Sequence, residues 1–210
     1  MAFQHISEGE TVIVSMRPWI LAICVTSGAM AIGSAQAAPV GLSGSDWAKI
    51  DRGEIVVTVG AKDGANQLYQ VVGTVGGTQA QVYKMLTDFG AHAQIFSKVK
   101  SSVIKKRLAA DHVQIYKELN LPWPMNGKTV LSDTTLRPAQ FGYDWHTIGG
   151  NVGTQRGSYE TISRNGKSVL VYKIWYDMAT AAMPKMVLDK AQQVALPGMI
   201  EDLRKAVSRY

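Results

Sequence analysis

The sequence predicts an α+β domain: a curved antiparallel sheet of about eight strands wrapped around a long C-terminal helix, with short helices after the second strand. Three features predict it. Six strand-length runs follow one another from residue 99 with only short links, whereas parallel strands need long crossovers. Two further strand-like runs precede them. An amphipathic helical pattern from Pro184 to about Ser208 ends the chain.

The N-terminal segment, residues 1–37, is predicted to be an extension and signal peptide. Residues 19–33 form an uncharged apolar run with Arg17 before it and an A-x-A cleavage pattern ending at Ala37. We expect translation to start at Met1 or Met16, cleavage near Ala37, and a periplasmic or secreted protein. A single transmembrane anchor is the alternative, but the run is shorter than the roughly 20 apolar residues of a span.

Composition narrows the classes of function for the remaining domain. Cys24 is the only cysteine and lies in the N-terminal segment, so the domain has no disulfide, thiolate metal site or cysteine nucleophile. The net charge is +6, and residues 1–37 hold one Arg and two Glu, which leaves +7 on the rest. A basic surface suits an anionic membrane surface or an acidic protein; export argues against nucleic acid. The alternative is a solvated basic face without a specific partner.

The first part of the domain is predicted to hold a hairpin and two short helices. The hairpin joins strands at 54–60 and 67–77. A short helix is expected at 46–51 with Ser45 as its cap, and a second helix follows Thr78. Apolar residues of the second helix recur at the spacing of one buried face: Val82, Met85, Leu86 and Phe89.

The later strands predict a cavity. They are expected at 99–108, 113–119, 129–136, 141–148, 153–162 and 168–177. Asn165-Gly166, between the last two, is a strong signal for a two-residue hairpin turn. The C-terminal helix is the only element long enough to cover the concave face, at roughly 1.5 Å per residue. A helix laid across a curved sheet leaves space beneath it, so we expect an interior cavity.

Several segments resemble a known superfamily. They are "LPWPMNGK" (121–128), "GSYETI" (157–162), "SVLVYKIWYD" (168–177) and the helical stretch 184–207. With the element order, they look like START-like, helix-grip (SRPBCC) proteins, which include START lipid-transfer domains, polyketide cyclases and coenzyme Q-binding proteins. START domains usually follow the Pro-Trp-Pro turn with Arg-Asp, where this chain has Lys128-Thr129. The resemblance implies a START-like domain at 45–208, closest in look to bacterial lipid-binding members. It also implies a cavity for an apolar small molecule or lipid, with no cofactor.

Nine residues are candidates for ligand binding, and strand alternation selects some of them. In 141–148, Phe141, Tyr143, Trp145 and Thr147 share the face expected to point inward. Asp144 and His146 share the outer face, which argues against catalysis by that pair. Tyr172 and Tyr176 are expected to line the cavity from the last strand. The candidates are Tyr116, Glu118, Trp123, Trp145, Arg156, Tyr172, Tyr176, Met186 and Met199.

The other candidates keep two interpretations each. Trp123, stiffened between two prolines, either walls one end of the cavity or packs under a loop. Arg156 forms a buried polar anchor with Glu118 or Glu160, or an ordinary surface pair. Met186 and Met199 give an adaptable pocket or fill the core.

Three functions remain open on the sequence alone. There is no G-x-S-x-G, H-E-x-x-H or phosphate loop. The four histidines, at 5, 92, 112 and 146, lack metal-ligand spacing. The leading hypothesis is an exported protein that binds or transfers a lipid, sterol or other apolar molecule. The second is a polyketide-cyclase-like enzyme using Glu118, Tyr172 or Arg156 as acid or base. The third is an accessory protein that docks an acidic exported partner.

Overall fold

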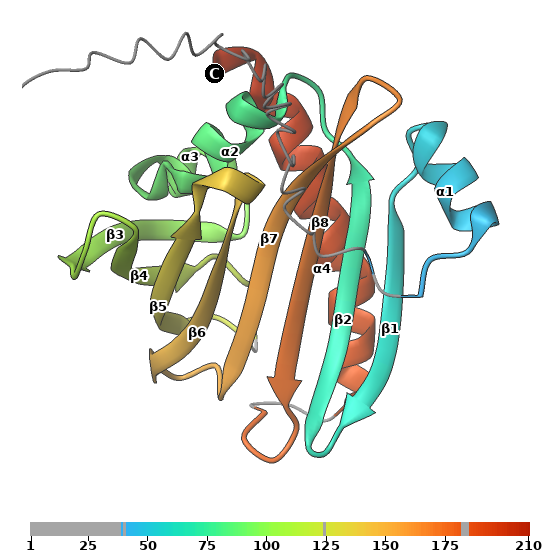
Figure 1. The fold of residues 1–210 in the computed structure, drawn as a ribbon. Coiled ribbons are helices and arrows are strands. Elements are labelled where there is room, and N and C mark those ends of the chain that lie inside the picture. The colour runs from blue at the N-terminus through green and yellow to red at the C-terminus, as the bar shows by residue number, and fades with distance from the viewer. Residues whose placement is uncertain (1–38, 40, 124, 182–184) are drawn as a thin grey trace, which may run out of the picture. The chain divides into compact units, whose positions relative to one another are not determined.

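The computed structural model describes residues 39, 41–123, 125–181 and 185–210 (Figure 1), so the predicted signal peptide and Cys24 lie outside the described residues. Eight strands form one antiparallel sheet in the order β1-β2-β8-β7-β6-β5-β4-β3. Their bounds are Val56–Asp63 (β1), Asn66–Thr74 (β2), Val99–Arg107 (β3), His112–Leu119 (β4), Thr129–Arg137 (β5), Gly142–Gly150 (β6), Gln155–Arg164 (β7) and Lys167–Asp177 (β8).

Four α-helices and three short 3-10 turns complete the described part. Their bounds are Gly44–Asp51 (α1), Gln79–Thr87 (α2), His92–Ile95 (α3), Lys185–Ala206 (α4), Phe89–Ala91 (η1), Pro138–Gln140 (η2) and Val207–Arg209 (η3). In Figure 1, α4 runs behind β7, β8 and β2, and α2 and α3 lie near its C-terminal end. Among the described helices, none has the length and apolar character needed to cross a membrane.

The predicted helix-grip architecture is confirmed. The six later strands lie close to their expected bounds, and each pairs antiparallel with the next in sequence. The last strand, β8, also pairs with β2 and so joins the N-terminal hairpin to the sheet. The β7–β8 turn has Asn165 at φ 50° and Gly166 at φ 72°. This left-handed pair is what a type I′ hairpin turn requires, as the Asn-Gly signal predicts.

Local capping agrees with the sequence at one helix and differs at the other. Thr78 caps α2, and Gln81 returns a hydrogen bond to the Thr78 N–H at 2.8 Å. The predicted Ser45 cap of α1 is wrong. Ser43 is the cap, because its Oγ accepts from the Asp46 N–H at 3.2 Å while the Asp46 carboxylate accepts from the Ser43 N–H at 3.1 Å. This reciprocal pair is a capping box.

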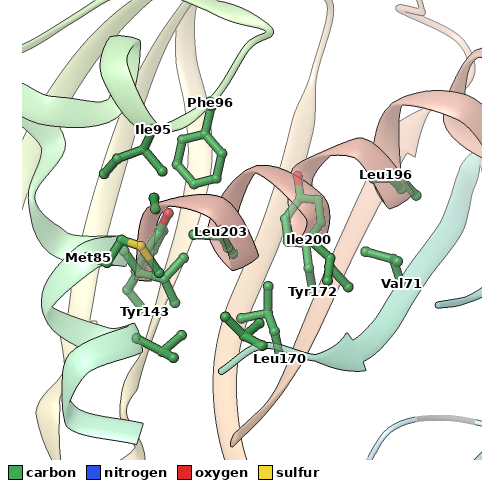
Figure 2. Close-up of a cluster of buried hydrophobic side chains, with 14 of the residues drawn as sticks. Val71, Met85, Ile95, Phe96, Tyr143, Leu170, Tyr172, Leu196, Ile200 and Leu203 are labelled. Atoms are coloured by element: carbon green, nitrogen blue, oxygen red, sulfur yellow. The ribbon is translucent and has the colours of Figure 1, made fainter. Parts of the chain in front are cut away.

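The two faces of the sheet bury different clusters. On the concave face, apolar side chains of α4 meet those of β2, β8 and the α2–α3 region; Figure 2 shows Leu196, Ile200 and Leu203 of α4 facing Val71, Leu170 and Tyr172 of the sheet. On the convex face, Ile50 of α1 packs against Val72, Val169 and Val171. Neighbouring residues of β8 thus serve opposite layers, as strand alternation requires.

Hydrogen bonds tie α4 to strands β2 and β8 and to two turns beside the sheet. The Arg204 guanidinium donates to the carbonyls of Thr74 and Gly53, each at 2.8 Å. The Asp202 carboxylate accepts from the Ser97 N–H at 2.8 Å. Nearer the start of the helix, the Gln192 amide donates to the Tyr176 hydroxyl at 2.9 Å. A helix fixed in this way cannot sink into space beneath its middle.

Candidate ligand-binding cavity

A cavity of about 220 Å³ lies between α4 and the strands β4 to β8. The interior cavity that the sequence predicts is therefore present. Protein interiors are close-packed and hold few voids larger than a water molecule, so a space of this size marks a candidate binding site.

Three tyrosines form one wall of the cavity. Tyr143, Tyr159 and Tyr172 lie opposite one another across β6, β7 and β8. The ring centroids of Tyr143 and Tyr159 are 4.7 Å apart, and those of Tyr159 and Tyr172 are 4.1 Å apart and stacked. Burial raises the pKa of Tyr159 to about 12 and the pKa of the other two well above the usual value. The wall therefore offers flat rings and neutral hydroxyls at physiological pH.

The next row of the sheet carries an indole held over a glycine. Trp145 lies opposite Gly157 on β7, and a Cβ on Gly157 would come within 2.7 Å of the indole Cε2 and Nε1. The glycine is therefore what lets the ring lie against β7. The Trp145 Nε1 is buried and has no hydrogen-bond partner among the described residues. A buried donor in this state is costly.

The opposite wall, from β4 and β5, is more polar. Ile115, Lys117 and Leu119 reach the cavity from β4, and Ser132 and Thr134 reach it from β5. Lys117 is half-buried, and its ammonium forms no hydrogen bond or ion pair within the part of the chain that the structure describes. Desolvation by its surroundings lowers the pKa of the Lys117 ammonium to about 8.

Four of the nine predicted site residues line the cavity, from the three elements β6, β8 and α4: Trp145, Tyr172, Tyr176 and Met199. Met199 crosses the cavity from α4, where its sulfur accepts a hydrogen bond from the Tyr159 hydroxyl at 3.5 Å. The alternation predicted for β6 is confirmed for Tyr143 and Trp145, which face inward. It is also confirmed for Asp144 and His146, which lie in a groove on the outer face.

Two predicted site residues lie on the outer face of β4. Tyr116 and Glu118 alternate with the cavity residues of that strand. The Lys105 ammonium lies 5.2 Å from the Tyr116 ring centre, and Glu118 forms an ion pair with Lys100 at 2.8 Å. The structure thus corrects their placement, because strand parity turns both side chains away from the interior.

Three more predicted site residues lie outside the cavity. Trp123 is 84% exposed and Met186 is 70% exposed, so neither forms a wall. Arg156 is on the outer face, where its guanidinium stacks 5.1 Å from the Trp175 ring centre and lies 3.7 Å from Asp63. The surface interpretation of Arg156 is the one that the structure favours.

Phe141 also differs from its predicted position. It precedes β6 and has φ 48°, in the left-handed region, so the alternation of the strand does not extend to it. Its ring instead meets Tyr83 edge-on, with centroids 6.2 Å apart.

The sequence did not single out Lys117, Ser132, Thr134 or Tyr159. A signal for two of them was present. Tyr159 shares strand parity with Gln155, opposite Arg156, and Lys117 shares parity with Val113 and Ile115. Because the apolar residues of β4 face inward, Lys117 must face inward too. Charged residues are rarely found there, so this position indicates a functional site.

Comparison with known proteins agrees with this geometry. Residues 75–204 match the model of the family described as "Polyketide cyclase / dehydrase and lipid transport". No protein with a curated description matches the sequence.

Solved structures share the fold. The Zhui aromatase/cyclase from Streptomyces sp. R1128 is similar with a TM-score of 0.60 and 14% identity, over 69% of this chain and 94% of that chain. A START superfamily protein from Mycobacterium smegmatis is similar with a TM-score of 0.58 and 13% identity, over 68% of this chain and 97% of that chain. A STAR-related lipid transfer protein from Xanthomonas axonopodis is similar with a TM-score of 0.55 and 13% identity, over 72% of this chain and 98% of that chain. Identities this low establish the fold alone.

Proposed function

Because the chain belongs to the family of polyketide cyclases, dehydrases and lipid-transport proteins, we propose that it binds and carries an apolar small molecule in the cavity beneath α4. The observation that carries this proposal is the cavity of about 220 Å³ itself, walled by tyrosine and tryptophan rings. Aromatic walls give a large apolar contact area at a low entropic cost.

The size of the cavity favours a small cargo. Typical ligand pockets measure about 300–1,000 Å³, and this cavity lies below that range. A ligand of about ten carbons gains roughly 8 kcal/mol from burial at about 0.8 kcal/mol per CH₂, of which association consumes several. The affinity expected for such a ligand therefore lies between tens of micromolar and about 1 mM. A molecule of two or three rings or a short chain fits better than a whole phospholipid.

Export completes the proposal. The apolar run at 19–33 and the A-x-A pattern ending at Ala37 support cleavage before the domain begins. The remaining +7 charge supports transient contact with an anionic membrane surface or an acidic protein. Cell fractionation with N-terminal sequencing tests export: we expect a periplasmic or extracellular chain that begins near Ala38, and a full-length cytosolic chain would contradict it.

Binding is tested by titrating the protein with N-phenyl-1-naphthylamine, a neutral apolar probe that fluoresces when buried. Ser132→Phe places a ring in the cavity, and Thr135→Phe places the same ring on the outer, exposed face of the same strand. We expect saturable binding in the wild type and in Thr135→Phe, and at least a tenfold loss in Ser132→Phe. Absence of binding in the wild type, or equal binding in all three, would contradict the proposal.

One observation favours a chemical step as a second candidate function. Glu118 and Arg156 do not reach the cavity, but Lys117 does, and a pKa of about 8 lets it exchange a proton near neutral pH. If the protein cyclises or dehydrates its ligand, the molecules extracted from Lys117→Met and from the wild type will differ by one water or by ring closure. Identical molecules in the two extracts favour carriage.

A further inference from the structure

Lys117 places a positive charge on the inward face of the sheet. It lies between Ile115 and Leu119 on the inward face of β4, opposite Ser102 of β3 and Val130 of β5. A lysine at a strand position normally extends its ammonium into water. Here the side chain lines a cavity whose other walls are largely aromatic and aliphatic.

No protein group neutralises this charge in the described residues. Asp202 is the one carboxylate among the described residues of the cavity wall, and its Oδ2 accepts the Ser97 N–H at 2.8 Å. Lys98, also on the wall, adds like charge. Desolvation is the cause of the lowered Lys117 pKa, with no carboxylate offsetting it. A desolvated cation without a partner is a strong anchor for an anion.

Other polar atoms near Lys117 also lack partners. Ser102, directly opposite Lys117, is 8% exposed, and its Oγ has no hydrogen bond in the described part of the chain. His92 is fully buried and uses Nε2 on the Leu86 carbonyl at 3.0 Å, while its Nδ1 is unpartnered in the same sense. Burial lowers the pKa of His92, and the nearby charge of Lys117 lowers it further. Buried polar groups are normally satisfied, and these are not.

We propose that the cavity binds a small amphipathic organic acid, whose carboxylate pairs with Lys117 while its apolar body lies against Tyr159 and Trp145. This inference rests on the proposed function and names the class of cargo. Both parts of the ligand have a counterpart in the wall. The Lys117 ammonium of β4 faces the anion, and the stacked rings of Tyr159 and Tyr172 on β7 and β8 face the apolar body.

The acid group should dominate selectivity. A hydrogen bond to a charged group in a desolvated site is worth more than one between neutral groups. We therefore expect an acid to bind about 10- to 100-fold more tightly than the alcohol or methyl ester with the same body.

The test displaces N-phenyl-1-naphthylamine from the protein at pH 7 with two matched sets. One is 2-naphthoate, 2-naphthalenemethanol and methyl 2-naphthoate; the other is decanoate and decanol. The variants are Lys117→Met and Lys117→Gln, with Lys105→Met as a control that removes an exposed lysine from the outer face of β3. We expect the wild type and Lys105→Met to prefer the acid in at least one set, and both Lys117 variants to bind acid and alcohol equally.

The outcomes separate this inference from the proposed function. If acids and alcohols compete equally in the wild type, or if the Lys117 variants keep the preference, the acid anchor is wrong and carriage of an apolar molecule stands. If the wild type binds neither the probe nor any competitor, both proposals fail.

Discussion

The two ends of the interior beneath α4 are built differently. At one end, Ile200 and Leu203 of α4 belong to one hydrophobic cluster with Val71, Leu170 and Met85, and all five are fully buried. At the other end, the same helix presents Ala195, Leu196 and Met199 to a cavity walled by tyrosines, an indole and a lysine. The same helix thus packs against the hydrophobic core at one end and covers the cavity at the other.

The difference shows that the hollow depends on how the helix is held as much as on curvature. Arg204 and Asp202 fix the packed end to Thr74 and Ser97, and Gln192 fixes the other side to Tyr176. Small or flexible side chains, Ala195 and Met199, lie between these contacts. The packed end supplies the stability that lets the other end stay open.

The largest expected effect is on the packed end. Leu203→Ala should lower the free energy of unfolding by about 2–5 kcal/mol, because it leaves a new void among rigid neighbours. Leu119→Ala, in the wall of the existing cavity, should cost about 1 kcal/mol or less, since its side chain is already partly exposed. Urea unfolding of both variants measures the two losses of unfolding free energy. Equal losses would contradict the distinction between a packed end and an open end.

Gly157→Ala should lower the free energy of unfolding by about 1–3 kcal/mol through overpacking. The new methyl group would lie 2.7 Å from the Trp145 indole and from the Lys173 carbonyl oxygen, so the ring must move into the cavity. Probe affinity should fall together with stability. The glycine would have no part in shaping the cavity if unfolding and probe binding both matched the wild type.

Lys117→Met should stabilise the unliganded protein by about 1–2 kcal/mol at pH 7, allowing for partial hydration of the side chain. The fold lowers the Lys117 pKa from 10.5 to about 8, so its charged form is penalised in the native state. The penalty is complete below pH 8 and disappears as the pH rises toward 10.5, where both states are neutral. Thermal unfolding at pH 7 and pH 10 checks the sign: the gain must shrink at the higher pH.

The smallest effect is on selectivity. If Lys117 anchors a carboxylate, the preference for acid over alcohol should fall about tenfold between pH 7 and pH 9, as the free ammonium loses its proton. The other titratable groups that face the cavity or interact with Lys117 are Lys98, Asp202, His92, Tyr143, Tyr159, Tyr172 and Tyr176. The pKa values of all four tyrosines are raised, and the pKa of His92 is lowered. The same measurement on Lys117→Met isolates the contribution of the lysine, because in this variant the preference for acid over alcohol should not change with pH.

The fold was largely predictable because its signals are local. Links such as Asn165-Gly166 are too short for anything but antiparallel neighbours, and Thr78 begins a helix through its own side chain. The inward face of β6 also followed from alternation, which placed Tyr143 and Trp145 on the cavity.

The site was predicted less well because chemical type and strand parity disagreed. On β4, Tyr116 and Glu118 resembled ligand contacts, yet the buried Val113 and Ile115 fix the opposite parity and bring Lys117 inward. Trp123 lies in a turn whose burial depends on distant contacts, so the stiff Pro-flanked geometry alone could not show that it is 84% exposed.

Native mass spectrometry of the protein purified from its own cells shows whether the cavity holds a small apolar molecule. We expect a mass above that of the bare polypeptide in the wild type and in Thr135→Phe, with the extra mass released on unfolding as a small organic acid. We expect only the bare mass in Ser132→Phe. A wild-type protein that shows only the polypeptide mass, and that takes up neither N-phenyl-1-naphthylamine nor 2-naphthoate, would contradict the proposed function.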